Sequence, residues 1–344
     1  MKAALLTAPQ TFQIESIPPP QPKEGEVIVR VKRAGVCGSD IHFYEAGRIG
    51  ETVLTDPFLM GHEFSGVIED ACGVSGAPQE GARVAVDPAV HCGVCPFCLA
   101  GRPNICPDVK FTGFPPYSGA FAEYISIPVQ NVYPMPDEIS DDCGPLLETL
   151  AVAVHTLELM GDVQGKNCAV LGAGPVGMLT MLTLRHYGAN VRFLTEPVKD
   201  RREKAMQLGC EFAFDPAQTD EIEDHSKRTT NYGPDIIFET AGEPESYQAA
   251  LEWVRPGGTV CIIGIYPQGA MPLDFTAARR KEAVIQLVRR SLPHNYPEAI
   301  RLAAEGAIDL PPLATHNFPL ERIGDAFSTA HHKTDGVIKA LVSP

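Results

Sequence analysis

Short apolar runs separated by turn residues characterise the first third of the chain. Residues 26–31 (EVIVRV) and 83–86 (RVAV) are rich in valine, and proline, glycine and aspartate follow at short intervals. Such runs are typical of strands rather than helices. Residues 2–132 are therefore predicted to form a largely β domain with many turns.

The pattern changes after Asp137. Pro145 opens an apolar helix that continues through Leu150 and Leu157. From Asn167 onward apolar strands alternate with helices. The strands are expected in CAVLGAG, in NVRFLTE and at residues 235–239 and 258–264, and the helices in PVGMLTMLTLRHYG and in a charged segment ending near Gly209. This alternation predicts a doubly wound, parallel α/β sheet.

The length and the last fifty residues bear on domain organisation. With 344 residues, and roughly 150 residues per domain, two domains are expected. Past Ser291 the pattern indicates a helix near residues 298–305, a link at Pro311 and Pro312, and a strand at 336–342. These elements either complete the first domain or extend the sheet, and their spacing does not decide between the two.

Composition excludes several classes of function. The formal charge is −15, which argues against nucleic acid as a partner because phosphate binding needs a basic surface. The N-terminus lacks a secretory pattern, and the long uncharged run between Lys166 and Arg185 is interrupted by glycines. We therefore expect a cytoplasmic protein with no membrane span, whose clustered cysteines bind metal instead of forming disulfides.

Four cysteines form one cluster with the spacing C-x2-C-x2-C-x7-C. Thiolates this close in sequence can enclose one tetrahedral Zn²⁺ and leave no open position, which describes a structural site. An iron–sulfur cluster is the main alternative. The cluster consists of Cys92, Cys95, Cys98 and Cys106.

A second candidate metal site combines Cys37 with His62, 25 positions later. A thiolate and an imidazole hold catalytic Zn²⁺ when a third ligand and a water or substrate complete the tetrahedron. Glu63 and Glu148 are both candidates for that ligand. Ser39 and His42 follow Cys37 closely and are candidates for carrying a proton from bound substrate to solvent.

A glycine-rich turn predicts a dinucleotide site. Gly172, Gly174 and Gly177 form G-x-G-x-x-G between a strand and a helix, as phosphate binding at a helix N-terminus requires. Glu196, 19 residues past Gly177, ends the next strand. A carboxylate there accepts from ribose hydroxyls and repels a 2′-phosphate, which favours NAD. Three nearby cations weaken that preference: Lys199, Arg201 and Arg202.

Taken together, these motifs resemble the zinc-dependent medium-chain dehydrogenases, and most closely their sorbitol (polyol) dehydrogenase branch. The resemblance spans the chain through CGSDIHFYEAGRIG, DPFLMGHEFSG, FPPYSGAFAEY, LLETLAVAVH, GAGPVG and THNFPLERIGDAF. It implies a GroES-like, mostly β catalytic domain (1–150 and 291–344) and a Rossmann NAD-binding domain (151–290).

The resemblance also implies the role of individual residues. Catalytic zinc would be held by Cys37 and His62, with Glu63 and Glu148 bound directly or through water, and the four clustered cysteines would hold structural zinc. Cofactor contacts would include Pro175, Val176, Glu196 and Arg201. The candidate substrate contacts are Phe43, Tyr44, Phe111, Glu148, Arg289 and Arg290.

Two of these positions depart from the polyol branch. Phe43, followed by Tyr44, stands where a substrate-contacting tyrosine is common, and Arg289 and Arg290 replace an Arg-Tyr pair. The loss of hydroxyls and the gain of a cation weaken the case for sorbitol itself, and suit a phosphorylated or acidic sugar.

We hypothesise an enzyme in which zinc lowers the pKa of a secondary alcohol and NAD accepts its hydride. The alternatives are a threonine dehydrogenase-like enzyme, a zinc-free quinone reductase relative and an NAD-sensing protein without turnover. The resemblance further implies a homodimer or homotetramer. Residues 258–266 are either an edge strand available for pairing or an ordinary buried strand.

Overall fold

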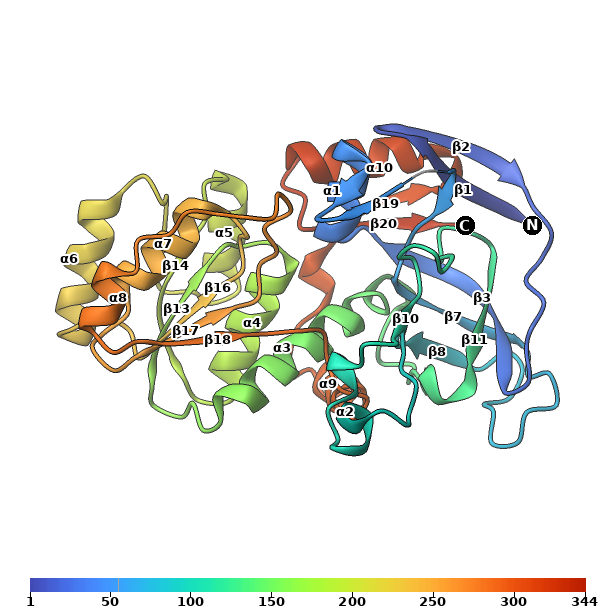
Figure 1. Ribbon diagram of the computed structural model, residues 1–344, viewed down its shortest axis with the longest axis horizontal. Coiled ribbons are helices and arrows are strands. Elements are labelled where there is room, and N and C mark those ends of the chain that lie inside the picture. The colour runs from blue at the N-terminus through green and yellow to red at the C-terminus, as the bar shows by residue number, and fades with distance from the viewer. Residues whose placement is uncertain (55) are drawn as a thin grey trace. The chain divides into compact units, whose positions relative to one another are not determined.

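The computed structural model describes residues 1–54 and 56–344. The chain forms two compact units, residues 1–151 together with 291–344, and residues 152–290 (Figure 1). Each is described by itself below.

The second unit is built on one six-stranded parallel sheet with the order β15-β14-β13-β16-β17-β18. The order reverses between β13 and β16, so the sheet is doubly wound as predicted. Figure 1 shows helices packed around this sheet. Its elements are β13 (Asn167–Leu171), α4 (Pro175–His186), β14 (Asn190–Thr195), α5 (Lys199–Gln207), β15 (Ala213–Phe214), α6 (Thr219–Thr230), β16 (Ile236–Glu239), α7 (Pro244–Trp253), β17 (Thr259–Ile262), α8 (Thr276–Arg280) and β18 (Val284–Leu287).

The strand within residues 258–266 does not lie at the edge of this sheet. The segment 258–266 contains β17, which pairs with β16 on one side and β18 on the other. The edge-strand interpretation of that segment is therefore wrong, and β18 ends the sheet. A short apolar strand has the same sequence pattern whether it lies at the edge of a sheet or one strand further in. Its position is decided by pairing with strands that are distant in the sequence.

The first unit is mostly β. Its main sheet has the order β12-β8-β7-β3-β20-β19, with β11 paired to β3, and β2-β1-β6 form a smaller one. The strands are β1 (Lys2–Ala8), β2 (Thr11–Ser16), β3 (Glu26–Gly35), β4 (Arg48–Ile49), β5 (Thr52–Val53), β6 (Phe58–Leu59), β7 (Glu63–Asp70), β8 (Arg83–Val86), β9 (Ala89–Val90), β10 (Lys110–Phe111), β11 (Tyr124–Pro128), β12 (Val132–Pro134), β19 (Ala314–Pro319) and β20 (Lys339–Ser343).

Helices are few in this unit. They are α1 (Gly38–Ala46), α2 (Pro96–Leu99), α9 (Asn295–Ala304) and α10 (Ile323–His332), with 3₁₀ turns at 103–105, 129–131, 141–143, 311–313 and 320–322. A further helix, α3 (Leu146–Met160), contains the point at which the chain passes to the second unit. Outside position 55, no helix combines the length and hydrophobicity that a membrane crossing needs.

The C-terminal segment completes the first unit. Strand β20 pairs antiparallel with β3, and β19 pairs parallel with β20. Helix α10 contributes Phe327, whose ring lies 4.7 Å from Phe12 and 5.5 Å from Phe121 between centroids. Residues near both ends of the chain therefore share one core.

The pairing of β3 with β7 yields a stability prediction. Gly66 lies opposite Val31, and a Cβ at Gly66 would stand 2.2 Å from the carbonyl oxygen of Arg30. Backbone cannot yield as a side chain can, so we expect Gly66→Ala to destabilise the fold by about 3 kcal/mol, measured by denaturant unfolding. Gly324→Ala is the matched control: a Cβ there meets nothing within 4 Å, and on α10 it should stabilise by up to about 1 kcal/mol. Equal stabilities of the two variants would contradict this account.

Candidate active site

Two neighbouring strands bring the predicted catalytic ligands together. Cys37 comes just after β3 as the N-cap of α1, while His62 and Glu63 stand at the start of β7, where Glu63 is directly opposite Gly35. One ligand atom from each of Cys37, His62 and Glu63 lies within 4.8 Å of the others. We call these three residues the catalytic cluster.

Asp40 orients two members of the catalytic cluster. Its Oδ2 accepts a hydrogen bond from the Cys37 backbone N–H at 3.0 Å, and its Oδ1 lies 3.4 Å from Nδ1 of His62. A carboxylate beside one ring nitrogen fixes the ring and leaves the other nitrogen for a ligand. The sequence reasoning did not single out Asp40, although it lies within the CGSDIH motif.

The proposed relay residues lie on α1. The Ser39 hydroxyl donates to Sγ of Cys37 at 3.4 Å, which places it against the catalytic cluster. His42 is half-buried one turn further along the helix.

Side chains from two other elements hold the Glu63 carboxylate. Its Oε1 accepts a hydrogen bond from the Thr149 hydroxyl of α3 at 3.1 Å, and its Oε2 forms an ion pair with Lys339 of β20. All three side chains are buried. Burial alone would raise the pKa of Glu63, but the charges of Lys339 and His62 and the hydrogen bonds from Lys339 and Thr149 together outweigh it and hold the pKa below its ordinary value.

Glu148 lies near the catalytic cluster but is not one of its three residues. Burial and the charge of Glu63 raise the pKa of Glu148 to about 7. The two candidates for the third ligand thus differ: Glu63 is grouped with Cys37 and His62, whereas Glu148 is an adjacent acid with a pKa near neutrality.

The chemistry of the catalytic cluster suits zinc. A thiolate, an imidazole and a carboxylate are three protein ligands of mixed softness, the number that leaves a fourth position open for catalysis. Phe111 packs against His62 with ring centroids 5.3 Å apart, and so borders the cluster.

The other two aromatic candidates lie in the core. Phe43 is buried against Phe114, with centroids 5.3 Å apart. Tyr44 belongs to an aromatic group with Phe12 and Phe327, at 5.9 and 5.2 Å. These contacts account for both rings as packing residues.

The four clustered cysteines have converged as predicted. Four of their Sγ–Sγ distances are 3.4, 3.6, 3.8 and 3.9 Å. A tetrahedron with zinc–sulfur bonds of ~2.3 Å has sulfur atoms roughly 3.8 Å apart. This spacing fits a single ion rather than an iron–sulfur cluster, whose thiolates bind separate iron atoms. Backbone N–H donors from Val94 and Cys95 also lower the pKa of Cys92 to about 7.

The glycine turn has the predicted geometry. Gly172 has φ of 106°, which favours glycine, and a Cβ at Gly177 would lie 2.0 Å from the Gly172 carbonyl oxygen. At Gly174, the N-cap of α4, an added Cβ would meet nothing within 4 Å. The first and third glycines thus serve the fold, and the second faces open space, as the pyrophosphate position of this motif requires. Pro175 and Val176 follow as the first residues of α4.

Glu196 follows β14 beside this turn. Its Oε2 accepts from Ala173 N–H at 2.8 Å and its Oε1 from Val198 N–H at 3.0 Å. The carboxylate is therefore fixed by the backbone next to Gly172 and Gly174.

The three nearby cations lie in different surroundings. Arg202 donates from one guanidinium nitrogen to the Glu196 and Pro197 carbonyls and to Asp215, at 2.6 to 3.1 Å. Lys199 is exposed and pairs with Glu203 at 3.5 Å. Arg201 is buried near Glu196, and burial lowers its pKa.

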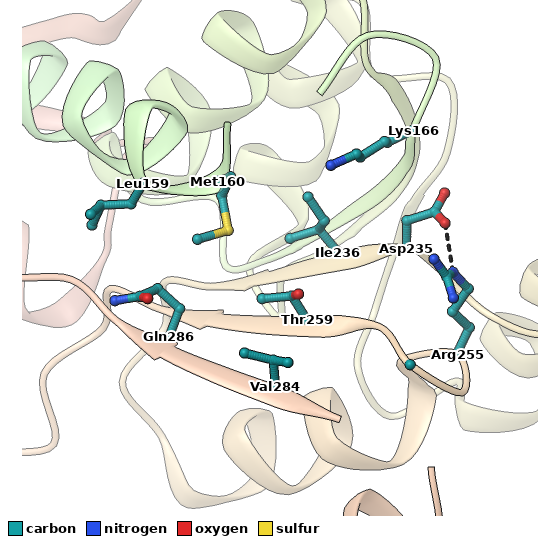
Figure 2. A pocket seen from close by; sticks show the side chains of 10 residues that line it. Leu159, Met160, Lys166, Asp235, Ile236, Arg255, Thr259, Val284 and Gln286 are labelled. Carbon is teal, nitrogen blue, oxygen red and sulfur yellow. Dashed lines mark hydrogen bonds and ion pairs between the residues drawn. The ribbon is translucent and has the colours of Figure 1, made fainter. Parts of the chain in front are cut away.

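The remaining candidates, Arg289 and Arg290, follow β18 at the end of the second unit. The same unit has a cavity of about 270 Å³ at the N-terminal ends of its strands, opposite to the glycine turn. Figure 2 shows Lys166 on its wall and the ion pair of Arg255 with Asp235. The paired nitrogen and oxygen atoms are 2.6 Å apart. None of the predicted site residues lines this cavity.

Comparison with known proteins identifies the family. Residues 23–137 match the alcohol dehydrogenase GroES-like domain, and residues 175–305 match the zinc-binding dehydrogenase domain. The sorbitol dehydrogenase of Bacillus subtilis is 35% identical over 344 residues, covering 100% of this chain and 97% of that protein. The chain belongs to the zinc-dependent medium-chain dehydrogenases. Its similarity is to their sorbitol/polyol branch.

Two solved structures of this family bear on the cofactor. A zinc-binding dehydrogenase from Sinorhizobium meliloti, bound to NADP, matches with a TM-score of 0.89 and 29% identity. An alcohol dehydrogenase from Escherichia coli, complexed with NADH, matches with a TM-score of 0.88 and 28% identity. Each comparison covers 100% of this chain and 99% of the other. A nicotinamide dinucleotide is thus the family's cofactor, and similar proteins bind either NADP or NADH.

The open space at Gly174 makes the nucleotide site testable. We expect Gly174→Ala to keep the wild-type melting temperature but to bind NADH roughly tenfold more weakly, because its methyl group enters the phosphate space. Gly177→Ala, whose Cβ would overlap backbone, should lose stability as well. Tight NADH binding by Gly174→Ala, followed by nicotinamide fluorescence, would argue against a phosphate position at this turn.

Proposed function

We propose that this chain is an NAD-linked, zinc-dependent dehydrogenase that oxidises a secondary alcohol of a polyol or sugar derivative. The observation that carries the proposal is the convergence of Cys37, His62 and Glu63, with Ser39 and Glu148 beside them. The full-length similarity to a sorbitol dehydrogenase supports the substrate class.

Cys37, His62 and Glu63 would hold the catalytic ion. When bound, zinc supplies a Lewis acid that lowers the pKa of an alcohol, and NAD supplies the hydride acceptor. Ser39, fixed against Cys37, accepts the hydroxyl proton of the substrate and passes it toward His42. Glu148, with a pKa of about 7, orients a water or a substrate hydroxyl beside the cluster.

A second ion at Cys92, Cys95, Cys98 and Cys106 would be structural. Four thiolates fill a tetrahedron and leave no position for substrate. We therefore propose one catalytic and one structural zinc per chain.

NAD is preferred over NADP in this proposal. The Glu196 carboxylate would repel a 2′-phosphate, and the contacts of Arg202 and Lys199 direct these cations to protein groups. Arg201, buried near Glu196, would contact the adenosine ribose.

The experiment is NADH formation by the zinc-loaded protein with polyols, sugar phosphates, aldonic acids, threonine and simple secondary alcohols, with NADP as a parallel cofactor. We expect an uncharged polyol and NAD to give the highest kcat/KM. Threonine as best substrate would contradict the substrate class. A phosphorylated or acidic substrate would assign specificity to Arg289 or Arg290, and NADH binding without any turnover would point to a sensor.

The matched variant is Cys37→Ser. It should lower kcat by a factor of about a hundred or more, because the ion loses its thiolate ligand. NADH binding should be unchanged, since the glycine turn lies outside the catalytic cluster. Retained turnover would refute the ligand assignment.

We further propose that the chain assembles into a homo-oligomer through β18. This strand ends the parallel sheet, and two of its apolar side chains, Val284 and Leu287, are 55% and 66% exposed. An apolar edge strand favours pairing with another strand, here that of a second copy. The choice between dimer and tetramer, and a cytoplasmic location, stay predictions from the sequence.

The β18 surface can be tested by charge. Leu287→Lys should dissociate the assembly in analytical ultracentrifugation, because a buried lysine without a partner opposes association. Tyr232→Lys, 78% exposed in the same unit, is the control and should keep the wild-type mass. An unchanged mass in Leu287→Lys would place the interface elsewhere.

A further inference from the structure

The ion pair between Glu63 and Lys339 joins the catalytic cluster to a residue that has no role in the proposed chemistry. Both side chains are at most 2% exposed. The ammonium of Lys339 also donates to the Val36 carbonyl at 3.3 Å, so it is held from both sides. Glu63 in turn is fixed on its other oxygen by Thr149.

The backbone leaves room for this pair. Glu63 on β7 and Lys339 on β20 approach each other over β3, the strand between them. A Cβ at Gly35 would lie 2.6 Å from Oε2 of Glu63 and 3.2 Å from Cδ of Lys339. The contact therefore depends on a glycine at this point of β3.

The Glu63–Lys339 pair affects the net charge of a bound zinc site. A thiolate from Cys37 and a carboxylate from Glu63 would together neutralise Zn²⁺. A Lewis acid acts through its positive charge, so anionic ligands weaken it. The Lys339 ammonium on Oε2 compensates one negative charge and restrains the carboxylate.

We infer that Lys339 is a positioning residue that restrains Glu63 and preserves the positive charge of the catalytic centre. This role rests on the proposed zinc site. Lys339 touches neither substrate nor cofactor in this account, and acts only through Glu63.

The test is the zinc affinity of the catalytic site, measured by competition with a chromophoric chelator. The chelator is expected to remove zinc from the catalytic site and from the four-cysteine site in separate phases. The phase that is missing in Cys37→Ser belongs to the catalytic site. If wild type lacks such a phase, the proposed zinc site itself fails, and the role of Lys339 fails with it.

We expect Lys339→Met to hold zinc about tenfold more tightly, because the ammonium no longer competes with the ion for the Glu63 carboxylate and a nearby cation is lost. Its kcat should fall. Lys339→Arg, which keeps the charge, should stay within about threefold of wild-type zinc affinity. Thr149→Val is the matched control, since it removes the other hydrogen bond to Glu63 without changing charge, and should also stay close to wild type.

A double variant separates the positioning role of Lys339 from a merely structural one, and it leaves no unpaired charge buried. In Glu63→Gln/Lys339→Met both charges of the pair are removed, and zinc affinity should return to the wild-type value or below. A gain that persists in the double variant would show that Lys339 does not act through Glu63. Unchanged zinc affinity in a folded Lys339→Met would overturn the inference and leave the pair a structural contact, while the zinc site itself would stand.

Discussion

The buried pair of Glu63 and Lys339 is the contact on which the geometry of the first unit depends. It joins β7 and β20 across β3, at the end of the sheet where Cys37 and His62 also lie. Breaking one side of such a pair costs roughly 3–5 kcal/mol, because an unpaired charge stays buried. The order of β7, β3 and β20 brings the two side chains together, and the glycine at position 35 leaves room for them.

The parts predicted from the sequence are those whose chemistry is local. Cys92 and Cys106 lie 14 residues apart, and the segment from Gly172 to Gly177 leads from the end of one strand into the first turn of one helix. In both cases the spacing alone fixes which atoms can meet. The parallel sheet followed likewise from the alternation of strands and helices.

The parts that were not predicted depend on distant pairing. Lys339 is a single cation in an apolar run, and nothing near it in the sequence indicates that its partner is Glu63. Strand β19 contains polar and half-exposed residues, so it lacks the pattern of a buried strand. The order of β17 and β18 similarly reflects which strand docks beside which, a property of the folded sheet.

The position of Lys339 near the end of the chain also sets an order of events during synthesis. It follows Glu63 by 276 residues, which ribosomes translate in roughly 15 to 55 s. During that interval β3 and β7 can pair, but the Glu63 carboxylate has no Lys339 ammonium to pair with. The nascent polypeptide therefore lacks the Glu63–Lys339 pair until the whole second unit has been translated. Metal captured earlier would meet a site of different charge from the finished one.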